Sequence, residues 1–558
     1  MRRSYGSVMA GAVALSVLSL TACGGSSAAG GASGSSPTAA ASGRGDTLTI
    51  GDVGGIGSFD PARANAGTDP TFLSEIYAPL FRIEPNGTTG GVLVSSFGYV
   101  GSGNKVFRMT IRSGAEFSNG QPVTAAAVTA SIKHYETGED GQQWLAGCTN
   151  VVTLPGSVVQ ITCAQGNPDI TFALSDGTTG GDIVAPAALA HPSTIATSPI
   201  GAGEYTLDAA ATITGSSYVY VANPKYFDQS AIHWNRIVVK VFQNSDTALA
   251  ALRSGQLNQL SLADPTAMQT AQEDGYHLQT IPDVFEGVGL WNRSATGGNP
   301  LASLKVRQAL EYAVDRQAIV KALFGQFGSV TDQVAVPSQP TSWDAAVNNY
   351  YSYDPAKAKS LLAAAGYPNG FTINVEDQGS LDAPMMQAVV GYWNAIGVKA
   401  NITQDATIPG WISDIMTRKF AAGAYGYGGL PMFMESVNWF LPYGNPFNPF
   451  ASSDPVMTSL LAKAGAETGA QQTADYEAVQ AEGVQQAWYI GIAVESIAVI
   501  NGTGITCAPG FRYRYSGTPL AAADACAAAS DTPSVALAPS FDLFAVPSRS
   551  ISVRSIAL

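Results

Sequence analysis

Cysteine and histidine are the residues of this 558-residue chain whose spacing bears most directly on chemistry. Apart from Cys23, the four other cysteines fall in two close pairs, Cys148 with Cys163 and Cys507 with Cys526. In an exported chain such an even number favours disulfides, although reduced buried thiols and other pairings stay open. The sequence contains no C-x-x-C pair and its four histidines stand singly, so no metal site is predicted.

Motifs for nucleophilic or phosphoryl chemistry are absent from the sequence, which has no G-x-S-x-G, no H-E-x-x-H and no P-loop. The S-x-x-K match at residues 102–105 lies in a glycine-rich turn, whereas acyl-transfer enzymes need this motif at the start of a helix. A glycosidase built on two carboxylates has no fixed sequence spacing and stays an alternative. We therefore predict no catalytic residue, no enzymatic activity and no cofactor.

The N-terminal segment has the pattern of a bacterial secretory signal, with two arginines, a short apolar run and small residues. The run is too short and too diluted by serine and glycine for a membrane-spanning helix. The letters LTAC, which end at Cys23, resemble the lipobox of bacterial lipoproteins, in which the cysteine becomes the acylated first residue. The resemblance implies lipidation of Cys23 and an extracytoplasmic chain anchored to the cell membrane; an ordinary secretory signal is the alternative.

Composition limits what the rest of the chain can be. Residues 24–46 are rich in glycine, serine and alanine and contain no aromatic residue, which is typical of a flexible tether. The following residues, 47–558, exceed what one core supports, so two or three domains are expected. The net charge of −14 and the lack of a basic run argue against a nucleic-acid partner.

Short strands and helices alternate along this body, which predicts an α/β fold without an internal repeat. Residues 106–112 alternate as a strand, and residues 70–80 have helical spacing. Thr124 is placed to cap a helix that begins at residue 125. Asp354 and the proline after it mark the start of another helix, which Gly366 ends.

Nine landmarks in a fixed order resemble the family 5 solute-binding proteins of ABC importers, the peptide/nickel/oligosaccharide-binding class. Each landmark is weak singly, and most are architectural; we expect Arg307 and Asp315, for example, to hold a helix in place by charge pairing. The landmarks are FDPA at 59–62, IYAPL at 76–80, FSNGQPVTA at 117–125, GAGEY at 201–205, NPKYF at 223–227, ALRSG at 251–255, VRQAL at 306–310, YAVDR at 312–316 and YDPAKAK at 353–359.

The resemblance implies a bilobed, periplasmic-binding-protein-like fold of type II (cluster C), which closes over a solute in the cleft between its lobes. We expect a monomer that hands its solute to the permease subunits of an ABC importer; a ligand-sensing lipoprotein of the same fold is the alternative. The expected division is a signal peptide over 1–22, a tether over 23–46, a first lobe from 47–81, 199–288 and 506–558, an additional small domain over 82–198, and a second lobe over 289–505.

The resemblance also points to the ligand. Peptide-binding members carry a Trp-x-x-Asp stretch whose aspartate pairs with the amino terminus of the peptide. Here Tyr427 falls at the tryptophan position and Leu430 at the aspartate position. Because leucine cannot offset the desolvation of an amine, a peptide with a free amino terminus is disfavoured. Glu435 is the candidate replacement, and a solvated surface position is the alternative for it.

Aromatic residues surround this stretch, and aromatic faces suit sugars, flat ring systems and apolar side chains. Packing in the core is the alternative for most of them. By analogy with the family, the loop from residue 65 to 71 lines the cleft from the first lobe. Arg418 is placed to meet an anionic group, and an exposed surface position is the alternative for it. The expected solute is a peptide or peptide-like molecule, with an oligosaccharide or a metal chelate as alternatives. The candidate ligand residues are Asn65, Asp69, Thr71, Phe285, Trp291, Trp411, Arg418, Tyr425, Tyr427, Glu435 and Trp439.

Overall fold

The structure is a computed structural model that describes residues 45–84, 88–339, 343–378, 383–405, 408–442, 447–502, 505–507 and 526–528. The expected signal peptide, the tether and the lipidation site Cys23 lie outside the described residues. Among the helices in these ranges, none combines the length and the apolar character that crossing a membrane requires.

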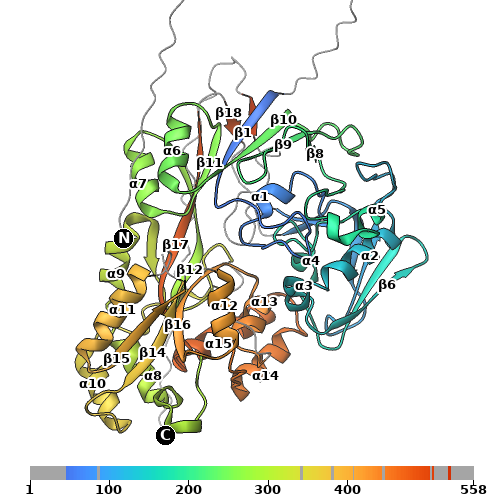
Figure 1. Ribbon diagram of the computed structural model, residues 1–558. Coiled ribbons are helices and arrows are strands. Elements are labelled where there is room, and N and C mark those ends of the chain that lie inside the picture. Colours follow the sequence, from blue (N-terminus) through green and yellow to red (C-terminus); the bar gives the residue numbers. More distant parts are fainter. Residues whose placement is uncertain are drawn as a thin grey trace, which may run out of the picture. The chain divides into compact units, whose positions relative to one another are not determined.

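A mixed sheet of eleven strands runs through the described chain (Figure 1). Strands from distant parts of the sequence are neighbours in it, which is typical of a crossover α/β fold. In spatial order the strands are β15 (Lys399–Gln404), β14 (Thr372–Asp377), β16 (Ala422–Gly428), β12 (Leu278–Gly289), β17 (Tyr489–Asn501), β11 (Gln259–Leu262), β1 (Gly45–Val53), β10 (Trp234–Phe242), β9 (Ser217–Ala222) and β8 (Tyr205–Leu207), and β13 (Gly328–Val330) pairs with β17.

The two longest strands lie in the middle of this sheet. β12 has 12 residues and β17 has 13, and they pair antiparallel along their length. The sequence of β17, YIGIAVESIAVIN, is apolar at almost every position and buried at almost every position. A strand that is covered on both faces needs such a continuous apolar run rather than an alternating one, so the sequence of β17 fits its central place.

Residues 94–163 form a separate sheet of four strands in the order β4 (Val94–Tyr99), β5 (Val106–Ile111), β7 (Val158–Cys163) and β6 (Cys148–Leu154). The predicted disulfide between Cys148 and Cys163 is present and joins β6 to β7. In the small sheet of β18 (Ile505–Cys507) and β19 (Cys526–Ala528), the backbone register sets Cys507 opposite Cys526. The side chains of this second pair lie outside the described residues, so its disulfide stays a prediction.

Helices connect and cover the strands (Figure 1). In chain order they are α1 (Pro70–Leu73), α2 (Ala125–Tyr135), α3 (Glu139–Trp144), α4 (Ile170–Ala173), α5 (Pro186–Leu189), α6 (Ser245–Arg253), α7 (Pro265–Glu273), α8 (Leu304–Tyr312), α9 (Arg316–Leu323), α10 (Pro355–Ala364), α11 (Ala383–Ala395), α12 (Ile408–Met416), α13 (Met432–Trp439), α14 (Pro455–Ala464) and α15 (Gly469–Gln485). Short 3-10 turns and the hairpin of β2 (Phe81–Ile83) with β3 (Thr89–Gly91) complete the described elements.

Two predicted helix starts are confirmed by their caps. The Thr124 side chain accepts from the backbone N–H of Ala127 at the start of α2. The Asp354 carboxylate accepts from the N–H of Lys357 at the start of α10. A cap needs residues two or three positions apart in the chain, so it can be recognised in a sequence without knowledge of the fold.

Two other expectations are wrong. The helix predicted over residues 70–80 stops at Leu73, because the carbonyls of residues 75 and 76 accept from Tyr205 and Gly203 in another part of the chain. Arg307 makes no charge pair with Asp315: it donates to the carbonyls of Gln486 at 2.8 Å and Leu301 at 2.9 Å. The Asp315 carboxylate instead caps α9.

Candidate functional site

The carboxyl ends of β14, β15 and β16 share one edge of the large sheet. β14 is parallel to β15, with Asp377 opposite Gln404, and parallel to β16, with Glu376 opposite Gly423. Because the strands run in one direction, the residues that follow them gather at the same edge, where open α/β sheets form their binding sites. α12 follows β15, and α13 follows β16.

The predicted aromatic residues of this region contact one another in a chain of rings. Trp411 on α12 lies 4.7 Å from Tyr425 on β16, measured between ring centroids. Tyr425 lies 5.9 Å from Trp439 on α13, which lies 5.9 Å from Phe285 on β12. All four side chains are buried, so packing accounts for most of their surface. The indole N–H of Trp411 has no hydrogen-bond partner among the described residues.

The other two aromatic candidates differ in what the structure describes of them. Trp291 is fully buried, and its ring packs where Gly289 and Gly423 leave room. A Cβ on Gly289 would lie 2.3 Å from the indole nitrogen and one on Gly423 would lie 2.5 Å from the ring. Tyr427 pairs with Phe285 through the backbone, and its side chain is not among those described.

Leu430 and Glu435, which follow β16, are both fully buried. The surface alternative for Glu435 is therefore wrong, because the carboxylate faces α15 and β17. Gln480 Nε2 donates to Glu435 Oε1 at 2.6 Å, and the Tyr489 hydroxyl donates to Gln480 Oε1 at 3.3 Å. The second oxygen, Oε2, has no partner among the described residues. Burial raises the pKa of Glu435 to about 8, against which the bond from Gln480 acts.

Arg418 is exposed at the end of α12. Its backbone has a φ of 59°, in the left-handed region, and its Nε donates to the carbonyl of Pro449 at 2.8 Å. The guanidinium lies beside the Phe450 ring, with its Cζ 5.9 Å from the ring centroid. The role predicted for Arg418, contact with an anionic group, stays a prediction.

The candidates among residues 65–71 lie in a loop that the carboxylate of Asp69 organises. Asp69 is buried and accepts from the backbone N–H groups of Gly57 at 2.9 Å, Ser58 at 3.1 Å and Asn65 at 3.1 Å. It also accepts from the Thr68 hydroxyl. Its oxygens are thus occupied within the loop, and Asp69 positions the other residues there. The Asn65 side chain is exposed and accepts from Gly67.

Asp52, which the sequence analysis missed, lies near the carboxyl end of β1 beside this loop. Its carboxylate accepts from the N–H of Gly55 at 2.9 Å. The side chain of Thr71, a predicted site residue, lies near it and acts to lower its pKa. Burial raises the pKa of Asp52 to about 6, and the nearby charge of Asp69 adds to the shift. An aspartate two positions before a pair of glycines is common in turns, so the sequence around Asp52 carries no distinct signal.

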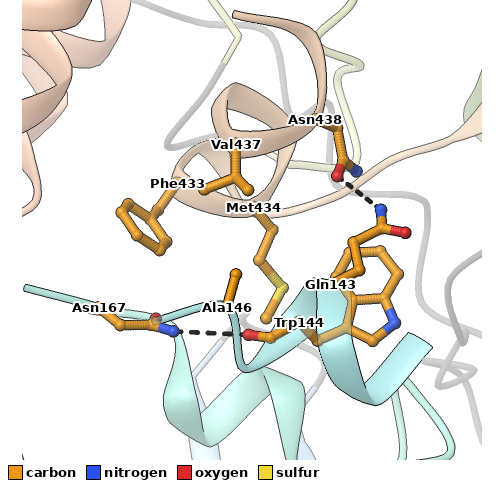
Figure 2. Close-up of a pocket in the computed structure, with 8 residues that line it drawn as sticks. All are labelled: Gln143, Trp144, Ala146, Asn167, Phe433, Met434, Val437 and Asn438. Carbon is orange, nitrogen blue, oxygen red and sulfur yellow. Dashed lines mark hydrogen bonds between the residues drawn. The ribbon is translucent and has the colours of Figure 1, made fainter. Parts of the chain in front are cut away.

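A contact between residues 82–198 and α13 was not predicted either (Figure 2). Gln143 Nε2 donates to Asn438 Oδ1 at 2.5 Å. The cavity at this contact holds about one water molecule, too little for a solute. Its lining residues are Gln143, Trp144, Ala146, Asn167, Phe433, Met434, Val437 and Asn438.

Asp169 strengthens the same contact. The backbone N–H groups of Met434 and Phe433, in the first turn of α13, lie near its carboxylate and act to lower its pKa. Burial is the larger effect and raises the pKa of Asp169 to about 7. A second polar contact lies nearby, where Asn104 Nδ2 donates to the carbonyl of Gly465 at 3.0 Å. Residues so far apart in the chain leave no sequence pattern that connects them.

Comparisons with known proteins agree with this architecture. The family profile described as bacterial extracellular solute-binding proteins, family 5, middle part, matches residues 90–449. Glutathione-binding protein GsiB of Salmonella typhimurium is 27% identical over 357 residues, which are 62% of this chain and 67% of that protein.

Solved structures resemble the described fold over most of its length. The periplasmic binding protein DppA of Helicobacter pylori, in complex with peptide STSA, has a TM-score of 0.73 at 17% identity and covers 87% of this chain and 98% of its own. AgaA of A. tumefacien R10, in complex with agropinic acid, has a TM-score of 0.71 at 22% identity and covers 82% and 94%. At these identities the likeness shows a shared fold, that of periplasmic binding proteins.

Proposed function

Because the chain belongs to the bacterial extracellular solute-binding proteins, family 5, we propose that it captures a small peptide-like solute and delivers it to the permease of an ABC importer. In this proposal the solute lies between the carboxyl end of β1 and the carboxyl ends of β14, β15 and β16. Sites in open α/β sheets form at such ends, and ligands of two-lobed proteins bind between the lobes. The protein binds and releases its solute unchanged.

The proposed ligand class rests on the position and burial of Leu430. It is a fully buried leucine at the position where the resemblance places the aspartate that pairs with a peptide amine. The nearby Glu435 carboxylate is bonded to Gln480 and directed at α15. An ammonium group bound at this position would lose its hydration without gaining a counter-charge. We therefore propose a peptide-like solute whose amino end is blocked or modified.

The names of the relatives are compatible with a solute whose amino end is blocked or modified. GsiB is named for glutathione, DppA was solved with peptide STSA, and AgaA was solved with agropinic acid. Proteins of this fold therefore take more than one kind of solute, and the choice must come from the residues of this chain. Trp411 supports a solute with a carbonyl group, because its indole N–H has no acceptor among the described residues and a buried donor favours a partner.

Matched pairs of peptides test the ligand class. The thermal midpoint of the full chain is measured with short peptides in free and N-acetylated form, with glutathione and with oligosaccharides. A ligand at 100 times its dissociation constant adds about 2.7 kcal/mol to the free energy of unfolding, which shifts the midpoint measurably. We expect the acetylated peptides to raise the midpoint more than their free forms.

The other outcomes of this panel are equally informative. A larger rise with the free peptides would refute the inference from Leu430 while supporting a peptide-binding function. A rise with oligosaccharides alone would refute the peptide-like class. Mass spectrometry of the solute after incubation checks that it is unchanged, and a cleaved solute would refute the binding-only role.

Substitution of Trp411 by leucine tests the placement of the site. Once a ligand is in hand, Trp411→Leu should weaken its affinity at least tenfold in calorimetry, because the solute loses an aromatic face and a donor. Trp393→Leu is the matched control, since Trp393 is fully buried in a different core cluster, among residues of α8 and β14. Equal affinities for the two variants would refute a ligand contact at Trp411.

We also propose that Cys23 carries the lipid anchor, on the strength of its lipobox-like sequence. Cys23→Ser should release the protein from the membrane fraction of the producing cells into the soluble fraction. Cys148→Ser is the control, because it removes a cysteine without touching the lipobox. Unchanged membrane association of the Cys23 variant would refute the anchor.

A further inference from the structure

Three carboxylates converge at the carboxyl edge of β14 and β15. Glu376 is the penultimate residue of β14, Asp405 directly follows β15, and Asp414 lies on α12. One oxygen of each carboxylate lies within 4.8 Å of the others. Like charges at such distances repel strongly, so the arrangement needs a compensating positive charge or a bound proton.

The buried carboxyl group of Glu376 lacks a hydrogen-bond partner among the described residues. Its side chain is fully buried, and neither Oε1 nor Oε2 has a hydrogen-bond partner among the described residues. Buried carboxylates are as a rule paired, hydrogen-bonded or coordinated to a metal, because leaving them alone costs several kcal/mol. This observation is independent of the number of acids nearby and points to a cation as the partner of Glu376.

The backbone holds the three groups in place. The ladder of β14 and β15 sets Glu376 opposite Thr403, and the N–H of Asp405 continues the ladder by donating to the carbonyl of Asp377 at 3.1 Å. The Asp405 carboxylate lies against the first turn of α12: a Cβ on Gly410 would be 2.5 Å from Asp405 Oδ1. Two strands and a helix therefore fix the donor atoms, as a preformed site requires.

The charges around the cluster favour a cation. Lys419 Nζ pairs with Asp414 at 2.6 Å, and its side chain is 54% exposed, so it can move into solvent when another cation arrives. Asp377, next to Glu376, adds negative charge at the edge. Burial raises the pKa of Glu376 to about 8, and the charges of Asp414 and Asp405 contribute.

We propose that Glu376, Asp405 and Asp414 bind a divalent metal ion of the calcium type. All the donors are carboxylate oxygens, which calcium, magnesium and manganese prefer, whereas zinc and copper favour nitrogen and sulfur. Oxygens that share a calcium ion at about 2.3–2.6 Å lie at most about 5 Å apart, a limit that the three groups meet. The inference goes beyond solute binding and does not depend on the proposed solute.

Metal titration of the full chain tests the proposal. The protein is freed of metal with a chelator and its thermal midpoint is followed with calcium, magnesium and manganese chloride. We expect a saturable rise with calcium that the chelator reverses, and a smaller rise with magnesium, which gives up its water reluctantly. A midpoint that no divalent ion raises would overturn the proposal. A rise produced by ammonium or guanidinium compounds and not by calcium would overturn the metal assignment.

Matched variants locate the ion. Glu376→Gln and Asp414→Asn should each abolish the calcium response or weaken the apparent affinity at least tenfold. Asp46→Asn, an exposed acid of β1, is the control and should respond as the unchanged protein does. Equal calcium responses in all of these proteins would overturn the assignment of the site.

Discussion

Glu435 is a carboxylate in an environment that suits a neutral group. It is fully buried, one oxygen is bonded to Gln480, and the other has no partner among the described residues. Burial raises its pKa to about 8. In the unfolded chain the same group ionises near 4.5. Between these two values the folded protein holds a proton that the unfolded chain has released, so folding becomes less favourable as the pH rises.

Glu435→Gln should remove this contribution. The amide keeps the shape of the protonated side chain and has no charge to bury, so the variant gains stability relative to the unchanged protein as the pH rises from 5 to 8.5. We expect a relative gain on the order of 3 kcal/mol in the free energy of unfolding. Urea unfolding at the two pH values measures it.

Glu482→Gln is the control for this substitution. Glu482 lies on α15, is only half-buried, and accepts from Gln486. It should show no comparable dependence on pH. A Glu435 variant whose stability relative to the unchanged protein is the same at both pH values would contradict the assignment of a raised pKa to Glu435.

At the scale of single residues, the sequence is informative where a role is local. Thr124 and Asp354 could be recognised as caps because their partners lie three residues away. Glu435 could not be placed, because its burial depends on Gln480, 45 residues later, and on Tyr489 in the central strand. The sequence predicted that Leu430 follows a strand, but its full burial could be seen only in the folded structure.

At the scale of elements, α13 depends on a distant residue for its first turn. Its N-cap is Pro431, which offers no side-chain acceptor. The carboxylate of Asp169, from the segment 82–198, lies near the N–H groups of Phe433 and Met434 in its place. A helix N-terminus leaves such groups unsatisfied and favours a negative charge. The first turn of α13 is therefore stabilised by its contact with the segment 82–198, through Asp169.

Asp169→Ala should therefore loosen the start of α13. The loss of a capping carboxylate costs about 1 kcal/mol of stability, and hydrogen exchange at the amides of Phe433 and Met434 should become faster. Hydrogen exchange with peptide-level mass spectrometry measures this change. Asp264→Ala is the control. Asp264 caps α7 by accepting from N–H groups within α7 itself, so its removal should leave exchange in α13 unchanged. Unchanged exchange in the Asp169 variant would contradict the capping role.

The elements themselves were predictable where periodicity and turn residues agree. The strand over residues 106–112 corresponds to β5, and the helix starts at 125 and 355 are those of α2 and α10. The helix over 70–80 was wrong because its carbonyls bind the backbone of residues 203 and 205. Packing against a remote segment overrides local helical spacing, and a single sequence contains no record of that segment's position.

At the scale of the whole molecule, the order of the landmarks predicted the family, and the profile match over residues 90–449 confirms it. The order suffices because each landmark marks a turn or cap that the shared fold needs at one place. The candidate site was harder to predict. The structure brings Trp411, Tyr425, Trp439 and Phe285 together, but it also places Asp52 and Asp169, whose roles arise only from neighbours distant in the chain.

Several buried carboxyl groups together determine how the stability of the molecule depends on pH. Burial is the largest cause of a raised pKa at each of them: Asp52, to about 6; Asp169 and Asp283, to about 7; Glu376 and Glu435, to about 8. Above the unfolded values near 4 and below these folded values, the folded chain binds more protons than the unfolded chain. The free energy of unfolding should therefore fall as the pH rises from 5 to 8.

Urea unfolding at pH 5, 6, 7 and 8 measures this slope, which amounts to about 1.4 kcal/mol per pH unit for each carboxyl that stays protonated only in the folded state. Calcium should make the slope shallower, because an ion bound at Glu376 replaces the proton there at every pH in the range. Glu376→Gln should have a shallower slope without calcium and no response to it. A stability that rises with pH would contradict the raised pKa values, whereas a falling stability that calcium leaves unchanged would contradict only the metal site.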